Sequence, residues 1–121
     1  GDLAASAASS VRQRNIVAKT ASATLRDVEA SDAIITNEGA EGPIVLTLPK
    51  ARAGMCLVIF VVSAHPIDIR PHGTDNILRG MALGNGRVRS PGTIGSALSL
   101  CKITATNWGV MEQTGEWKGV Q

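Results

Sequence analysis

Residues 42–62, GPIVLTLPKARAGMCLVIFVV, decide the fold that this sequence predicts. The pattern indicates a strand at 44–48, a polar turn, and a second strand at 57–62. Side chains alternate between the two faces of a strand. The second strand is therefore apolar on both faces, with Leu57, Ile59 and Val61 on one and Val58, Phe60 and Val62 on the other. Such a strand needs cover on both sides, from a second sheet, from another copy of the chain, or from both.

The rest of the chain predicts an all-β fold. Its 121 residues are enough to bury a core without help from metal ions or disulfides. Turn signals recur at intervals of about a dozen residues or fewer, and no helical period continues outside the N-terminal segment. We therefore expect a small antiparallel β-sandwich or barrel-like domain over residues 23–121. Further short strands are expected at 24–28, 33–36, 67–70, 77–78, 87–89, 97–103 and 108–112.

Residues 1–22 are expected to form an extended N-terminal arm that takes little part in the fold of the β domain. The segment is rich in Ala and Ser, so burial within the chain offsets little of its backbone entropy. It also carries most of the positive excess of a chain whose formal net charge is +2. We expect the arm to bind an acidic surface of another chain, whereas the alternative is that its charges only keep it solvated. The predicted partner-binding residues are Arg12, Arg14, Ile16, Val17 and Lys19.

Composition also bears on the class of partner. A net charge of +2 and an aromatic content of 2% argue against nucleic acid as a partner. No run is long and apolar enough to span a membrane, and no segment has the pattern of a signal peptide. Trp117 could serve as a platform for a sugar ring, but its large apolar area favours a role in holding the last strand on the core.

The two cysteines, Cys56 and Cys101, each lie in an apolar strand run. Free cysteine behaves as a small hydrophobic residue, so the sequence predicts two buried free thiols rather than a disulfide. Neither cysteine has a neighbouring histidine or the CxxC spacing that favours catalysis through sulfur.

Two short patterns could carry chemistry. His65 with Asp68, and His72 with Asp75, both have the spacing H-x-x-D, which could supply two metal ligands or an acid and a base. A metal site also needs a third and a fourth ligand with suitable geometry, and the sequence offers no set that converges on either pair. We interpret all four as ordinary loop and strand residues. No catalytic residue, cofactor or metal site is therefore expected, and the chain is interpreted as a binding and assembly module rather than an enzyme.

The order of short motifs carries a further signal. The motifs are ITNEGAEG at 35–42, LTLP at 46–49, AGM at 53–55, IRPHGTDNI at 69–77, SPG at 90–92, GS at 95–96, WGV at 108–110 and GEW at 115–117. In this order they resemble a β module of virion proteins from tailed bacteriophages, over about residues 24–118. The sequence departs from that module in its basic arm and in its lack of Tyr.

The resemblance implies a homotrimer, because such modules occur in trimeric capsid decoration (cement) proteins and in trimeric tail fibre or spike proteins. We expect a decoration protein that binds the major capsid protein and stabilises the phage head. Its expected place is the capsid surface of the virion, after synthesis in the host cytoplasm. The alternative is a trimeric tail fibre or spike domain that binds a glycan on the host surface.

Overall fold

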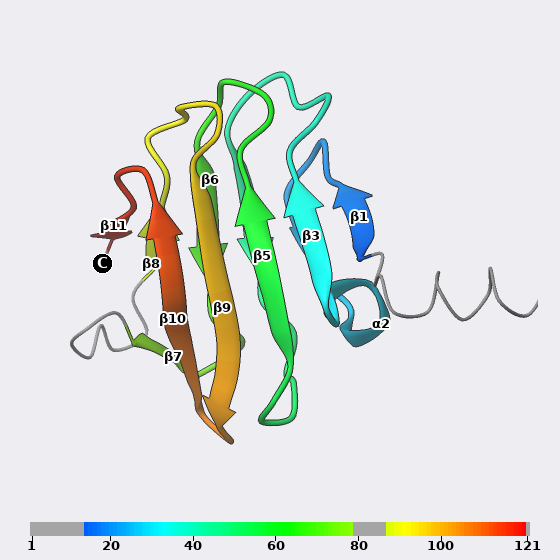
Figure 1. The fold of residues 1–121 in the computed structure, drawn as a ribbon, viewed down its shortest axis with the longest axis vertical. Helices are drawn as coiled ribbons and strands as arrows, with labels where there is room; N and C mark the ends of the chain where they lie inside the picture. Colours follow the sequence, from blue (N-terminus) through cyan, green and yellow to red (C-terminus); the bar gives the residue numbers. More distant parts are fainter. Residues whose placement is uncertain (1–13, 79–86, 121) are drawn as a thin grey trace, which may run out of the picture.

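The computed structural model describes residues 14–78 and 87–120, which form two β-sheets packed face to face (Figure 1). One sheet contains β1 (Asn15–Ala18), β3 (Ala33–Thr36), β5 (Cys56–Phe60), β7 (Asn76–Leu78), β9 (Ala97–Thr104) and β10 (Asn107–Thr114). The other contains β2 (Ala23–Thr24), β4 (Ile44–Thr47), β6 (Ile67–Arg70), β8 (Arg87–Arg89) and β11 (Lys118–Val120). A four-residue helix, α2 (Asp27–Ala30), lies beside the start of β3. The predicted all-β class is confirmed.

Successive strands from β1 to β9 alternate between the two sheets. The six-stranded sheet has the order β1-β3-β5-β9-β10-β7, and the five-stranded sheet has the order β11-β8-β6-β4-β2. In the first half of the chain, the backbone crosses to the opposite sheet and then crosses back, and the strand that follows runs in the same direction as the earlier strand beside it. Thus β1, β3 and β5 are parallel neighbours, and so are β2, β4 and β6.

The prediction of an antiparallel sandwich is therefore wrong for the first half of the chain. The pairs β5–β9, β9–β10, β6–β8 and β8–β11 are antiparallel, so both sheets are mixed. The reason is that turn residues mark where the chain changes direction but not which strand the next one pairs with. At most turns of this chain, the next strand crosses to the opposite sheet instead of pairing with the strand before it.

The expected strand at 24–28 is also corrected, because β2 ends at Thr24 and the helix α2 begins at Asp27. Local charges explain the helix. The Glu29 carboxylate accepts a hydrogen bond from the backbone N–H of Arg26 at 2.9 Å, which satisfies a donor at the helix N-terminus. Asp27 and Glu29 both lie in the first turn, where negative charge is favoured.

The core lies between the sheets and is built from the inner faces that the alternation predicts. Leu57, Ile59 and Val61 are fully buried, whereas Val58, Phe60 and Val62 keep part of their surface exposed. Trp117 is 1% exposed, and its Nε1–H donates to the carbonyl of Thr114 at 3.0 Å. Its predicted role in holding the last strand on the core is confirmed.

Asn37 is a buried polar residue that shapes one connection between the sheets. Its Oδ1 accepts hydrogen bonds from the backbone N–H groups of Val62 and Ser63, at 2.8 and 2.9 Å. Its Nδ2 donates to the carbonyls of Ser63 and His65, at 3.0 and 3.2 Å. One side chain thus satisfies the backbone where the chain leaves β5 for β6.

Residues 15–18, which the sequence analysis assigned to the arm, are part of the six-stranded sheet. They form β1, which pairs in parallel with β3, and the N–H of Lys19 donates to the carbonyl of Thr36 at 2.9 Å. This corrects the boundary between arm and β domain, because the sheet already includes Asn15. Residues 1–13 of the expected arm lie outside the described residues.

Cys56 and Cys101 form a disulfide, so the prediction of free thiols is wrong. They are direct partners in the antiparallel pair β5–β9, with their Cα atoms 4.0 Å apart. The two residues are 45 apart in the sequence, and nothing local indicates that their strands are neighbours. The disulfide joins β5, which pairs in parallel with β3, to β9, which pairs antiparallel with both of its neighbours.

We predict that thiol titration of the denatured, unreduced protein finds no free thiol, and that reduction releases two per chain. The double variant Cys56→Ala/Cys101→Ala should lower the free energy of unfolding by about 2–4 kcal/mol, because the link restricts the unfolded chain. Chemical denaturation of both proteins measures this difference. Two titratable thiols without reductant would contradict the disulfide.

Candidate interaction surface

The side of the six-stranded sheet that faces away from the five-stranded sheet is here called the outer face, and Figure 1 looks onto it. The strand register places a row of side chains across it. Ile16 lies opposite Ile34, which lies opposite Val58. The row continues through Ser99 to Glu112. The row is thus apolar on β1, β3 and β5, and polar on β9 and β10.

The apolar half of the outer face forms a shallow hollow of about 360 Å³. Ile16 on β1 is 70% exposed and Phe60 on β5 is 36% exposed, so the hollow presents apolar surface to solvent from two strands. The hollow is lined by Ile16, Ile34, Thr36, Glu38, Phe60 and Val62.

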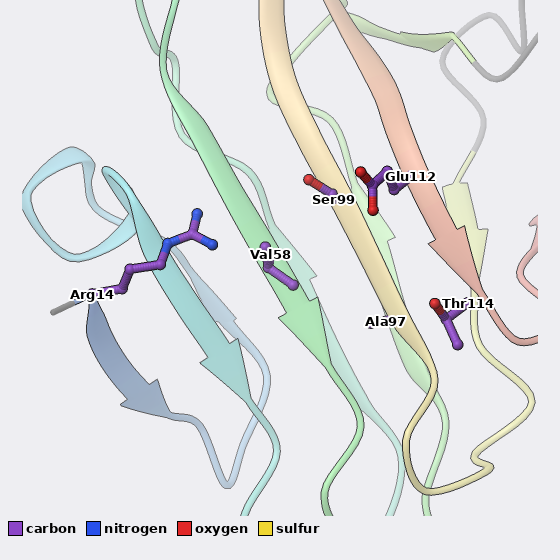
Figure 2. Close-up of a pocket in the computed structure, with 6 residues that line it drawn as sticks. All are labelled: Arg14, Val58, Ala97, Ser99, Glu112 and Thr114. Carbon is purple, nitrogen blue, oxygen red and sulfur yellow. The ribbon is translucent and has the colours of Figure 1, made fainter. Parts of the chain in front are cut away.

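The polar half forms a second hollow, of about 260 Å³ (Figure 2). Val58 and Ala97 contribute apolar atoms, and Ser99 and Thr114 contribute hydroxyl groups. The remaining lining residues are Arg14 and Glu112. Figure 2 shows the Arg14 side chain reaching from the start of β1 across β3 toward Val58, with Glu112 beyond, on the far side of β9.

A β-bulge in β10 places Glu112 on the outer face. Val110 pairs with Leu100, but Glu112 pairs with Ser99, so the register shifts by one residue at Met111. Strict alternation from the buried Trp108 would put Glu112 on the core side. Bulges redirect side chains in this way.

The predicted partner-binding residues differ in where the structure places them. Arg14 and Ile16 lie on the outer face, and Arg14 Nε lies 3.3 Å from Asp32 Oδ1. Val17 instead packs against the core. Lys19 forms an ion pair within the chain, with its Nζ 2.9 Å from Glu29 Oε2. Arg12 lies outside the described residues.

Glu29 links three parts of the N-terminal region. One carboxylate oxygen accepts the Arg26 N–H, and the other accepts from Lys19, which follows β1. The backbone hydrogen bond from Arg26, followed by the contact with Lys19, holds the pKa of Glu29 below its ordinary value of 4.5, although partial burial opposes this. The carboxylate thereby ties the end of β1 to α2.

The aspartates of the two H-x-x-D pairs, Asp68 and Asp75, bind cationic side chains of the chain itself. The guanidinium of Arg89 makes two hydrogen bonds to Asp68, and this contact raises the pKa of Arg89. Asp75 accepts a hydrogen bond at 2.7 Å from the buried ammonium of Lys102. That ammonium also lies 5.4 Å from the centre of the Trp108 ring. Across residues 14–78 and 87–120, no group of three or more His, Cys, Asp or Glu side chains is placed to hold a metal ion.

Ser99, Glu112 and Thr114 line one hollow with Arg14, and none of the three was predicted from the sequence as a site residue. Period-2 alternation in 97–103 does place Ser99 away from Leu98 and Leu100. No local signal shows the bulge, or that β10 lies in the same sheet as β1.

No protein-family model matches the chain, and no curated protein sequence matches it significantly. Within the described part of the chain, no helix has the length and apolar character to cross a membrane. The outer face is the feature from which a function can be inferred.

We predict that Glu29→Gln lowers the free energy of unfolding at neutral pH by about 1 kcal/mol, because glutamine can still accept the Arg26 N–H but loses the charge that interacts with Lys19 and with the helix N-terminus. The pKa of Glu29 is lowered in the folded protein. Its contribution is therefore fully present above pH 4.5 and is lost as the pH falls through the lowered value. Denaturation curves from pH 7 to pH 3 should show the two proteins converging in acid.

The matched control is Glu41→Gln, which removes an exposed carboxylate from the loop before β4. It should leave stability within about 0.5 kcal/mol at every pH, as surface substitutions usually do. A difference between Glu29→Gln and the unaltered protein that stays constant down to pH 3 would contradict the assigned role.

Proposed function

We propose that this chain is a binding and assembly module that forms a homotrimer through its outer face and decorates the head of a tailed bacteriophage. The observation that carries the proposal is the unequal cover of β5. The five-stranded sheet covers Leu57 and Ile59 completely on the inner side, while Phe60 on the outer side stays 36% exposed among the described residues. A second copy of the chain is the partner that we propose for this side.

The energetics favour covering the outer face. Removing apolar surface from water contributes about 25 cal/mol per Å². Contiguous apolar patches beyond a few hundred Å² are rare on monomeric proteins and mark interaction sites. Ile16, Ile34 and Phe60 lie on three neighbouring strands, so one flat partner surface could cover all of them.

The place on a phage head rests on the resemblance of the motif order to virion β modules. The disulfide between Cys56 and Cys101 changes one element of the expectation, because the host cytoplasm keeps thiols reduced. In this proposal the chain is made with reduced thiols. The disulfide closes after release of the virion, since disulfides persist on virion surfaces. The segment before β1, with Arg12, is the proposed contact with the major capsid protein.

The polar hollow favours a second candidate function, a trimeric tail fibre or spike domain that binds a host-surface glycan. The hydroxyl groups of Ser99 and Thr114 and the carboxylate of Glu112 could form hydrogen bonds with sugar hydroxyls. Glycan-array binding by the unaltered protein, lost in Glu112→Gln, would favour this candidate over decoration of the head.

We predict that the protein has three times its chain mass of 12.5 kDa at micromolar concentration, by mass photometry or sedimentation. Ile16→Asp and Phe60→Asp should each shift it to monomer, because a charge in an apolar contact is costly to desolvate. Ile94→Asp is the control, since Ile94 is 62% exposed but lies in the loop between β8 and β9. A stable monomer of the unaltered protein would contradict the trimer.

We also predict that deletion of residues 1–13 leaves the trimer and its β-type circular dichroism intact but abolishes binding to undecorated phage heads. The deletion stops before β1, so the sheet keeps all its described strands. Binding of the full chain should weaken as salt rises, because the proposed contact is between opposite charges. Decoration of heads at equal occupancy by the truncated protein, seen by electron microscopy, would remove the N-terminal segment from the proposal.

A further inference from the structure

Arg14 and Glu112 carry opposite charges at opposite sides of the outer face. Arg14 directly precedes β1, the edge strand, whereas Glu112 lies in β10, on the other side of β3, β5 and β9. Neighbouring strands are about 4.8 Å apart, so the strands that carry the two residues are separated by roughly 19 Å. The two side chains line the same hollow, but in the described part of the chain the ion pair of Arg14 is with Asp32 and not with Glu112, so the Glu112 carboxylate can pair with a cation of another copy.

A closed ring of identical copies joins two different patches, so that one side of each copy contacts the other side of the next. Three copies whose outer faces turn toward a common axis would bring the β1 side of one face against the β10 side of its neighbour. Opposite charges on those two sides are the complementarity that such a contact requires.

We infer that, in the trimer, the guanidinium of Arg14 in one copy pairs with the carboxylate of Glu112 in the next copy. This inference rests on the proposed function. It names the residues that fix which side of one copy contacts which side of the next. The occupant of the outer face is a second copy of this chain, because its β10 side presents the Glu112 carboxylate to the guanidinium on the β1 side.

The surroundings of Arg14 suit this role. Asp32, which directly precedes β3, lies 3.3 Å from Nε of Arg14 and so holds the base of the guanidinium. The end of the guanidinium then points over Val58, into the polar hollow (Figure 2). The apolar atoms of Val58 and Ala97 reduce the water around a pair formed there, which strengthens its attraction.

Glu38, a further carboxylate on the outer face, does not offer the same match. Glu38 lines the apolar hollow together with Ile16, on the β1 side of the sheet. It therefore lies on the same side of the ring contact as Arg14. Glu112 differs from Glu38 because it lies at the β10 side of the outer face, where the bulge in β10 places it.

The test is a charge exchange, read from the dissociation of the trimer on dilution by mass photometry. Arg14→Glu and Glu112→Arg should each weaken the trimer by at least about tenfold, in keeping with coupling energies of close interface charge pairs. The double variant Arg14→Glu/Glu112→Arg restores opposite charges with the signs exchanged. It should return the dissociation constant to within about threefold of the unaltered protein, because the pair is rebuilt.

Asp32→Asn is the matched control, since it removes the carboxylate that contacts Arg14 within the chain and leaves Arg14 and Glu112 in place. Asp32 has a φ of 53°, a conformation that asparagine also tolerates, so the fold should persist. This variant should keep the trimer, and circular dichroism should show the same β content in all variants.

The outcomes separate this inference from the function on which it rests. If the unaltered protein is trimeric and the double variant dissociates as readily as the two single variants, the Arg14–Glu112 pair is wrong and the trimer stands. If Glu112→Arg leaves the trimer intact and abolishes glycan binding, the polar hollow is a ligand site and the pair is again wrong. If the unaltered protein is a monomer, both the inference and the trimer fail.

Discussion

Burial of one aliphatic face of each sheet against the other is the interaction on which the rest of this structure depends. The chain crosses between the sheets after almost every strand, so each crossing adds one strand to each side of the same core. Asn37 and Lys102 enter this core with their polar groups paired. Asn37 bonds the backbone at one crossing, and Lys102 pairs with Asp75 beneath Trp108. Unpaired, such groups would cost several kcal/mol each.

The same crossing pattern explains why the outer face of the six-stranded sheet has two different halves. The core uses the inner side of β5, and the parallel neighbours β1 and β3 extend its apolar outer side. The antiparallel strands β9 and β10 then add small and polar side chains. The outer face is therefore not a uniform apolar surface, because apolar residues and Arg14 lie on one side and Glu112 on the other. That asymmetry suits a ring contact between copies better than a simple stack.

Two local links hold the parts of the outer face together. The disulfide joins β5 to β9, where the parallel half of the sheet meets the antiparallel half. At the edge, Glu29 connects Lys19 to the start of α2, which anchors β1 from its C-terminal end. Edge strands are the elements that open most easily. The position of Arg14, just before β1, therefore depends on this anchor as well as on the pairing of β1 with β3.

The sequence by itself determined the strands and the faces of their side chains, because alternation along a strand is a local property. It placed Leu57 and Phe60 on opposite faces, brought Trp117 to the core, and selected Arg14 and Ile16, which lie on the outer face. Only the tertiary structure decided which strands are neighbours. Parallel pairing, the Cys56–Cys101 disulfide and the inclusion of β1 in the sheet all depend on contacts between distant segments, which turn spacing does not encode. The outward position of Glu112 depends on a register shift against β9, so no pattern within its own strand could have revealed it.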